Sequence, residues 1–248
     1  MTIHRFYVPS VSGIEHRVRL SHDEALHATR VLRLRSGTAV RIFDGRGREY
    51  LGLLEIAGRD NVAVRTTKEV VTAREPRVIT TLAQALLKNR KLDDVVKDAT
   101  MLGVRTIRPL VSANTEVAYS AETESDVVPR WERIAVASAK QCGRAVVPNV
   151  HPPTSVPECL RNTRDDLRLI FVEPIRANAR EGLAMLADRP RPNRATLVVG
   201  PEGGWTDDEI KLATGSGCEA VTLGDRTLRA DAMPIAALSV LFYLWGDL

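Results

Sequence analysis

Residues 197–206 read Leu197-Val-Val-Gly-Pro-Glu-Gly-Gly-Trp-Thr206, a short apolar run followed by a loop that contains three glycines. The apolar run predicts a buried strand, and the residues from Thr206 onward predict a helix. Glycine permits positive φ angles and lets the backbone approach a ligand closely. Because α/β sheets bind ligands beyond the carboxyl ends of their strands, this stretch predicts a binding loop. A tight turn that binds nothing is the alternative.

On either side of this loop, apolar runs alternate with helical patterns. Strands are predicted over residues 78–85, 106–111, 167–173, 195–200 and 219–224. Helices are predicted over residues 91–102, 131–142, 177–187 and 206–214, with the acidic stretch 112–126 and the proline-rich segment 148–157 as connections. Such alternation is typical of an α/β domain with a mostly parallel sheet that helices cover on both faces.

The first third of the chain has a different rhythm. Short predicted strands with glycine-centred turns between them indicate a small β-barrel, over residues 5–8, 17–20, 39–43, 49–56 and 62–70. A helix over residues 21–32 is predicted to begin at Ser21, with Glu24 completing a capping box. A boundary near residues 72–76 then divides the chain into domains 1–73 and 74–248.

Charge is distributed unevenly between these domains. The chain has 35 basic and 31 acidic residues, a formal net charge of +4. Residues 1–73 hold 12 Lys and Arg against 8 Asp and Glu, so the whole excess lies there, and 11 of the 12 are arginine. Because a guanidinium donates paired hydrogen bonds to phosphate, the barrel is predicted to contact nucleic acid. A solvated basic surface is the alternative.

Composition narrows the class of protein. A chain of 248 residues with 44% hydrophobic and 27% charged side chains is not intrinsically disordered and has enough apolar residues for a core. No secretory signal opens the sequence, and the longest apolar run, residues 232–245, is too short to span a membrane. The cysteines form no Cys-x-x-Cys pair, and the histidines lack metal-ligand spacing. We therefore expect a cytoplasmic protein that binds neither membrane nor metal.

The last predicted helix, residues 233–245, is apolar on nearly every side. A helix of this kind must be buried. It is either an ordinary core helix or part of an interface between two subunits.

A second loop combines opposite charges at the end of a predicted strand. It reads Leu223-Gly-Asp-Arg-Thr-Leu-Arg-Ala-Asp-Ala232, with Asp225, Arg226, Arg229 and Asp231 within seven residues. Salt bridges among these side chains are one explanation. The other is a site where backbone groups bind one ligand and Arg229 contacts a second.

Together the two loops resemble those of the RsmE-type methyltransferases of the SPOUT (trefoil-knot) superfamily, which use S-adenosylmethionine to methylate N3 of a uridine in 16S ribosomal RNA. Further segments match the family pattern in order: Arg5-Phe, His27-x-x-x-Val-Leu-Arg33, Lys88 through Lys91, Ala99-x-x-Leu-Gly103 with Pro109, and Gln141-x-Gly-Arg144. One segment departs from the pattern. The family's Leu-Arg-Thr-Glu-Thr is here Leu228-Arg-Ala-Asp-Ala232, which keeps a shorter carboxylate and loses both hydroxyls.

The resemblance implies an N-terminal PUA-like barrel, a C-terminal trefoil-knotted SPOUT domain and a homodimer that acts on 16S rRNA of the small ribosomal subunit. It also implies that S-adenosylmethionine is bound mainly by backbone groups of the two loops, with strand ends beside them. The residues concerned are Val172, Val199, Gly200, Gly203, Gly204, Leu223, Gly224, Leu228 and Arg229.

Methylation at uridine N3 requires loss of a proton and stabilisation of the charge that develops on O2 or O4. We expect Arg229 to supply the cation and Glu202 or Asp231 to receive the proton, although either acid could instead hold an arginine in place. Phosphate contacts are expected from six basic residues: Arg5, Arg30, Arg33, Lys88, Arg90 and Arg144.

Two other functions fit part of the sequence. A non-catalytic RNA-binding protein would use the barrel alone and would have no use for the glycine-rich loop. An α/β enzyme could bind a nucleotide or phosphate at residues 200–204. This second alternative lacks the Gly-Lys-Ser/Thr of a Walker A loop and the Gly-x-Gly-x-x-Gly of dinucleotide-binding proteins.

Overall fold

The computed structural model describes residues 3–11, 13–58, 61–117, 121–174 and 182–248. The chain divides into two compact units, Met1–Arg74 with Val136–Val147 and Glu75–Ala135 with Pro148–Leu248. The sequence predicts a single boundary near residue 73. In the structure the last seven residues of helix α3 (Ala121–Cys142) also belong to the first unit, where Ala139 and Ala145 pack against Phe43.

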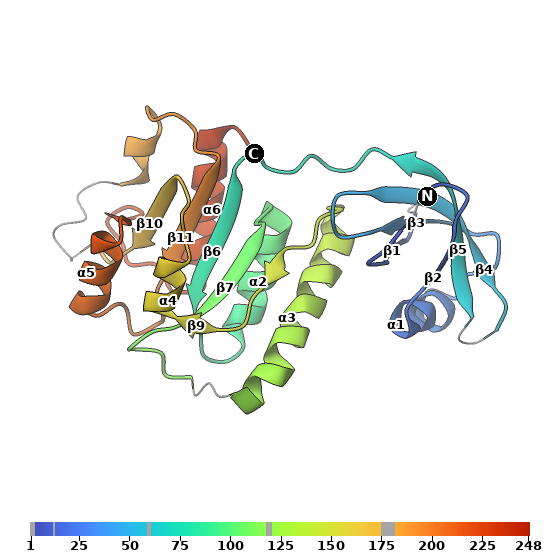
Figure 1. Cartoon of the computed structure of the whole chain (residues 1–248), viewed down its shortest axis with the longest axis horizontal. Helices are drawn as coiled ribbons and strands as arrows, with labels where there is room; N and C mark the ends of the chain where they lie inside the picture. The colour runs from blue at the N-terminus through green and yellow to red at the C-terminus, as the bar shows by residue number, and fades with distance from the viewer. Residues whose placement is uncertain (1–2, 12, 59–60, 118–120, 175–181) are drawn as a thin grey trace. The chain divides into compact units, whose positions relative to one another are not determined.

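The first unit is built on a five-stranded sheet with the order β1-β3-β4-β5-β2 (Figure 1). Its strands are β1 (Arg5–Tyr7), β2 (Arg17–Arg19), β3 (Ala39–Phe43), β4 (Glu49–Ile56) and β5 (Val62–Val70). β1 pairs with β3 in parallel, and the other pairs are antiparallel. The alternating apolar residues of these strands, including Phe6, Ile42 and Leu54, form a buried core as the sequence predicts.

The helix predicted over residues 21–32 is divided into α1 (His22–Leu26) and a π-helical turn (His27–Val31). Ser21 caps α1 by accepting a hydrogen bond from the Glu24 backbone N–H at 3.3 Å. The predicted reciprocal bond of a capping box is not among the described contacts. Instead, the Glu24 carboxylate binds the Lys140 ammonium, with O–N distances of 2.7 and 2.9 Å, and the Tyr7 backbone N–H.

The second unit contains a seven-stranded sheet with the order β12-β10-β11-β6-β7-β8, and β9 pairs with β7 (Figure 1). The strands are β6 (Ile79–Ala85), β7 (Thr106–Val111), β8 (Asn149–Val150), β9 (Thr154–Ser155), β10 (Leu167–Phe171), β11 (Arg194–Val199) and β12 (Glu219–Val221). All strand pairs among the described residues of this sheet are parallel, as predicted. Parallel strands bring their carboxyl ends to one edge, and the candidate site lies there.

Helices cover both faces of this sheet. On one face, α4 (Val156–Arg161) and α5 (Asp207–Gly215) pack on the alternate strand residues Ala83, Leu110 and Val198. α2 (Lys91–Leu102) contacts α6 (Met233–Trp245), which packs against β11. α2 buries its predicted apolar stripe and ends at Gly103, whose φ of +112° is the left-handed conformation expected of a C-terminal glycine.

Three connections differ from the prediction. α3 begins at Ala121, earlier than the predicted start at residue 131, and contains Pro129. The proline-rich segment 148–157 contributes β8, β9 and the start of α4, because the edge of β7 offers pairing partners. Of the helix predicted over residues 177–187, residues 177–181 lie outside the described residues, and Leu183–Leu186 form a 3-10 helix.

The apolar α6 is a core helix along most of its surface. Seven of its 13 residues are buried, including Leu241 and Phe242. Val240 and Tyr243 are 38% and 74% exposed. None of the helices in the described part of the chain is long and apolar enough to cross a membrane.

Candidate active site

A cavity of about 260 Å³ lies at the carboxyl ends of β10 and β11, between the loops 200–206 and 223–232. It brings together most of the residues predicted to bind the cofactor: Val172, Val199, Gly200, Gly204, Leu223, Leu228 and Arg229. Glu202 also lines it. Gly203, Gly224 and Asp231 are next to lining residues in sequence but do not line the cavity themselves. Two loops separated by a strand and a helix thus share one pocket.

The conformation of the first loop depends on glycine at Gly204. Its φ is +68°, and a Cβ atom added there would collide with the Glu173 carboxylate, which also lines the cavity. A side chain at Gly203 would meet the Asn114 Cβ at 3.0 Å. The close approach of backbone to neighbouring groups explains why this loop is rich in glycine.

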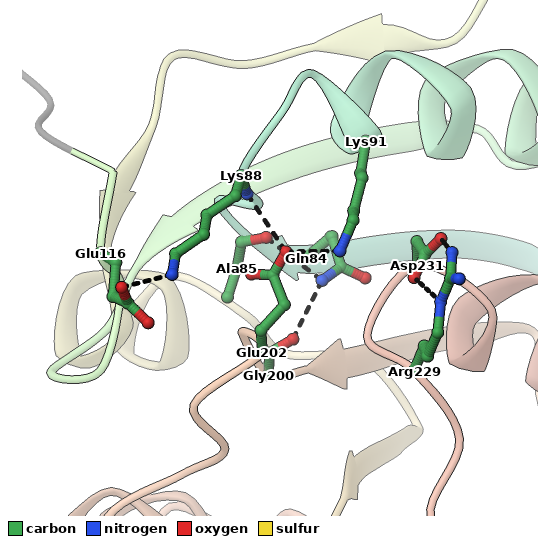
Figure 2. Close-up of polar contacts among 9 residues, drawn as sticks. All are labelled: Gln84, Ala85, Lys88, Lys91, Glu116, Gly200, Glu202, Arg229 and Asp231. Carbon is green, nitrogen blue, oxygen red and sulfur yellow. Dashed lines mark hydrogen bonds and ion pairs between the residues drawn. The ribbon is translucent and has the colours of Figure 1, made fainter.

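Hydrogen bonds from three polar side chains tie this loop to other segments of the unit. The Trp205 indole N–H donates to the Phe171 carbonyl at 3.0 Å, and Trp205 is 1% exposed. Gln84 Nε2, at the end of β6, donates to the Gly200 carbonyl at 3.1 Å (Figure 2). Asn114 Nδ2 donates to the Gly203 and Gly204 carbonyls at 3.2 and 3.0 Å. The loop is therefore fixed before any ligand arrives.

Glu202 is held by the start of α2. Its Oε1 accepts hydrogen bonds from the Lys88 backbone N–H at 3.2 Å and from the Lys91 ammonium at 3.1 Å. Its Oε2 makes no hydrogen bond or ion pair with a described residue. The Lys88 ammonium pairs with Glu116 instead (Figure 2). Glu202 therefore keeps one carboxylate oxygen for a further partner.

Arg229 and Asp231 form an ion pair on the second loop. Arg229 Nε donates to Asp231 Oδ1 at 3.1 Å, and its terminal nitrogen donates to Oδ2. The hydrogen bond from Arg229 holds the pKa of Asp231 below its ordinary value of 3.8, and it raises the pKa of Arg229. The predicted salt bridging within this loop is present, and the Arg229 side chain is still 75% exposed.

Lys91 lies in the segment 88–91, which matches the family pattern, but no catalytic or binding role was predicted for it. It lines the cavity, and Figure 2 shows its side chain descending between Glu202 and the Arg229–Asp231 pair. Other lining residues that were missed include Phe171, Glu173, Trp205, Arg226 and Met233. Lys91 could have been found from its motif, and Glu173 from its position as the last residue of the predicted strand 167–173.

The basic residues predicted to contact RNA fall into two groups. Arg30, Arg33 and Arg90 are exposed, and Lys88 is half-buried beside the cavity loop. In contrast, Arg5 donates to Glu49 and to the carbonyls of Ala139, Lys140 and Arg144, and its side chain is 11% exposed. Arg144 is 5% exposed. Arg5 and Arg144 therefore stabilise the first unit.

The site contains the groups needed for transfer to an acidic N–H. Apolar strand ends and backbone atoms form the walls, and three cationic side chains, Lys91, Arg226 and Arg229, line the cavity. Glu202, with an available oxygen, lies beside Lys91 (Figure 2). No group of three or more potential metal ligands occurs in the part of the chain that the structure describes.

Comparison with known proteins gives consistent results for both units. A family model described as an RNA methyltransferase domain matches residues 74–242, and one described as an RNA methyltransferase PUA domain matches residues 20–67. The protein named ribosomal RNA small subunit methyltransferase E from Synechocystis is 30% identical over 239 residues, which cover 95% of this chain and 76% of the relative. The protein of the same name from Mycobacterium tuberculosis is 29% identical, covering 97% and 92% of the two chains.

A solved structure is similar along the whole chain. It is a ribosomal RNA small subunit methyltransferase E from Neisseria gonorrhoeae bound to S-adenosyl methionine, with a TM-score of 0.89, 29% identity and coverage of 98% of each chain. The predicted fold class, an α/β domain of SPOUT type with a PUA-like N-terminal barrel, is confirmed by these similarities.

Proposed function

Because this chain belongs to the ribosomal RNA small subunit methyltransferase E family, we propose that it transfers the methyl group of S-adenosylmethionine to N3 of one uridine in 16S ribosomal RNA. It is an S-adenosylmethionine-dependent rRNA methyltransferase. The cavity that joins the loops 200–206 and 223–232 is the observation that supports the reaction most directly, since Glu202 and Arg229 both line it.

The residues of the cavity fit this cofactor. A Cβ atom at Gly200 would come within 3.0 Å of the Trp205 ring, and one at Gly204 would collide with the Glu173 carboxylate, so the loop that lines the cavity requires glycine at both positions. Val172 and Val199 supply apolar walls. Backbone groups of the two loops, including those of Leu223 and Leu228, would bind the polar parts of the cofactor. When bound, the cofactor supplies an electrophilic methyl group on a sulfonium.

The chain's own residues would handle charge and proton. As the N3–H bond breaks, its proton passes to a carboxylate, and the N3 electron pair forms the bond to the methyl carbon while the carbon–sulfur bond breaks. Negative charge on uridine O2 or O4 is stabilised by the exposed Arg229 guanidinium, with Lys91 as a second cation.

Of the two predicted proton acceptors, we favour Glu202. It lines the cavity, and its Oε2 has no described partner. Asp231 has both oxygens engaged by Arg229, and this hydrogen bonding lowers its pKa, which makes it a weaker base. In this proposal Asp231 is a positioning residue that orients Arg229.

Further parts of the proposal concern organisation and partners. Residues 1–73 would form the RNA-binding PUA-like domain, and residues 74–248 the methyltransferase domain. Arg30, Arg33, Lys88 and Arg90 would contact phosphates, whereas Arg5 and Arg144 would act through the packing of the first unit. We also propose a homodimer formed through the exposed side of α6, and a cytoplasmic location, where ribosomal subunits are assembled.

The decisive experiment uses S-adenosylmethionine with a labelled methyl group and small ribosomal subunits that lack their modifications. The labelled nucleoside is then identified after complete digestion of the RNA. Label at N3 of one 16S uridine is the expected result. Label on another base or atom would overturn the assignment of the target, and no transfer to subunits or to protein-free 16S rRNA would overturn the proposed reaction.

A further inference from the structure

One face of the parallel sheet changes from apolar to polar towards the amino ends of its strands. On this face Ala83, Leu110 and Val198 belong to the buried cluster beneath α4 and α5. Because side chains alternate along a strand, the residues two positions earlier share the same face. These residues are Thr81, Arg108 and Thr196. The apolar core therefore ends at Ala83, Leu110 and Val198, and beyond it the same face of the sheet carries one arginine and two threonines.

A pocket of about 430 Å³ opens over these residues. α4 is short and ends at Arg161, so it leaves this end of the sheet uncovered (Figure 1). Arg161 lines the pocket from the last position of α4, Arg164 from the connection that follows, and Arg194 from the start of β11.

The lining of this pocket is strongly positive. It contains four arginines and one acidic residue, Asp165, a formal charge of 4 − 1 = +3. Asp165 is already engaged, since it accepts from Arg194 Nε at 3.0 Å and from the Thr196 hydroxyl at 2.5 Å. Nearby, the exposed Asp166 accepts from the backbone N–H groups of Asn193 and Arg194 and does not line the pocket.

Three of the arginines have no counter-charge. The side chains of Arg108, Arg161 and Arg164 make no hydrogen bond or ion pair with any described residue. Arg108 is half-buried, and desolvating a cation without a partner is unfavourable. Planar guanidinium groups that converge on a recess are suited to paired hydrogen bonds with an oxyanion.

We propose that this arginine pocket, defined by Arg108, Arg161, Arg164 and Arg194, binds phosphodiester groups of the RNA substrate. The inference rests on the proposed function, which supplies the RNA. The pocket lies at the amino ends of the strands, and the methyl-transfer cavity lies at their carboxyl ends. The two sites therefore contact different parts of one RNA.

The separation of the two sites fits this arrangement. Arg194 begins β11, and Gly200 follows its last residue, so six residues of extended chain separate them. At roughly 3.3 Å per residue this is about 20 Å, a distance that a few nucleotides of RNA can span. An RNA that holds its target base in the cavity can thus reach the arginine pocket with a neighbouring segment.

The test compares RNA binding by wild-type protein and the double variant Arg161→Ala/Arg164→Ala. Both side chains are exposed, so the variant is expected to fold, which its thermal melting curve verifies. The affinity for protein-free 16S rRNA is measured between 50 and 300 mM salt, a range that includes 0.1 M, where the Debye length is about 10 Å. Loss of two phosphate contacts should weaken binding roughly tenfold and flatten the slope of log K against log salt by about 1.4 to 1.8.

A matched control removes the same charge from another surface of the same unit. Arg189→Ala/Arg191→Ala changes two exposed arginines that lie outside the arginine pocket. An equal loss in both variants would overturn the proposal in favour of diffuse charge attraction, and unchanged binding in the pocket variant would also overturn it. Stabilisation of the wild type alone by micromolar inorganic phosphate, with RNA binding unchanged in the variant, would assign the pocket to a free anion.

Methyl transfer is measured separately, so that the two proposals fail in different ways. We expect S-adenosylmethionine affinity and turnover at saturating RNA to be unchanged in the pocket variant, with a KM for RNA raised about as much as the Kd. A wild type that binds RNA through the arginine pocket but transfers no methyl group would overturn the proposed function alone. Normal methyl transfer with unchanged RNA binding in the variant would overturn this inference alone.

Discussion

Arg229 donates hydrogen bonds from Nε and from a terminal nitrogen to the two carboxylate oxygens of Asp231, two residues further along the chain. The family pattern has glutamate between two threonines where this chain has Ala230-Asp231-Ala232. The shorter aspartate still reaches the guanidinium without help from the missing hydroxyls. The departure therefore preserves an oriented cation at the cavity.

The first prediction concerns Arg229. Arg229→Ala should lower the rate of methyl transfer about 100- to 1000-fold, because it removes the main cation from the position where negative charge develops. Affinity for S-adenosylmethionine, measured by calorimetry, should change little. Lys97→Ala removes an exposed cation of the same unit that pairs with Asp94, and it should leave both quantities unchanged. Turnover at the wild-type rate in Arg229→Ala would contradict the role assigned to this residue.

The second prediction separates the two candidate proton acceptors. Glu202→Gln keeps the size of the side chain but removes the base, so the rate should fall about 100-fold or more and recover as pH rises and uridine loses its proton to solvent. Asp231→Asn keeps an oxygen that can accept from Arg229 and should cost roughly tenfold, without such recovery. Rates measured from pH 6 to 9.5 distinguish the two. A larger, pH-dependent loss in Asp231→Asn would reverse the assignment.

The third prediction concerns a residue outside both loops. Asn114→Ala removes two hydrogen bonds to the carbonyls of Gly203 and Gly204, each worth about 0.5–1.5 kcal/mol. We expect S-adenosylmethionine affinity to fall roughly 5- to 30-fold, while RNA affinity stays unchanged. Asn149→Ala changes an exposed asparagine of β8 that lines neither the cavity nor the arginine pocket, and it is the control. Equal cofactor affinity in wild type and Asn114→Ala would show that the loop holds its shape by other contacts.

Much of the fold follows from local sequence patterns. β3, β4, β5 and β7 occupy the predicted residues because each alternates or carries a short apolar run between clear turns. The apolar stripe of α2 and the continuous apolar surface of α6 likewise determine both helices to the residue. In each of these elements the preference of the segment agrees with its place in the core.

The parts that were not predicted depend on partners distant in sequence. β8 and β9 have two residues each and exist because β7 pairs with them. Glu24 has a local role in a capping box, but its carboxylate binds Lys140, 116 residues away. Arginine is a common phosphate-binding residue, but the guanidinium of Arg5 donates its hydrogen bonds to Glu49 and to carbonyl groups near the end of α3. Residue type alone does not reveal such long-range partners.

The fourth prediction is a loss of stability at mildly acidic pH. Burial, with the positive charge of Lys140, lowers the pKa of His27 below 6.5, and burial with Arg108 does the same for His151. The unfolded chain therefore binds more protons than the folded chain as pH falls through 6.5, so the free energy of unfolding decreases with falling pH.

Denaturant unfolding at pH 7.5, 6.5, 5.5 and 4.5 measures this effect. His27→Asn/His151→Asn should flatten the pH dependence within this range. The carboxyl group of Asp231, whose pKa lies below 3.8, contributes only at lower pH. An equally steep decline in the double variant would show that other groups are responsible.

The fifth prediction tests the proposed homodimer at α6. Ala236, Val240 and Tyr243 follow one another at helical spacing, and the last two are 38% and 74% exposed on an otherwise buried helix. Tyrosine at the centre of an interface commonly contributes 2 kcal/mol or more, so Tyr243→Arg should weaken dimerisation by roughly thirtyfold or more. Sedimentation velocity over a range of concentrations measures this change.

Val71→Arg replaces a side chain that is 97% exposed in the first unit, and it should leave the association unchanged. Because Tyr243 is mostly exposed in the single chain, its replacement should not alter the melting temperature of the monomer. A wild-type protein that sediments as a monomer at micromolar concentration would instead assign this apolar strip to a different contact.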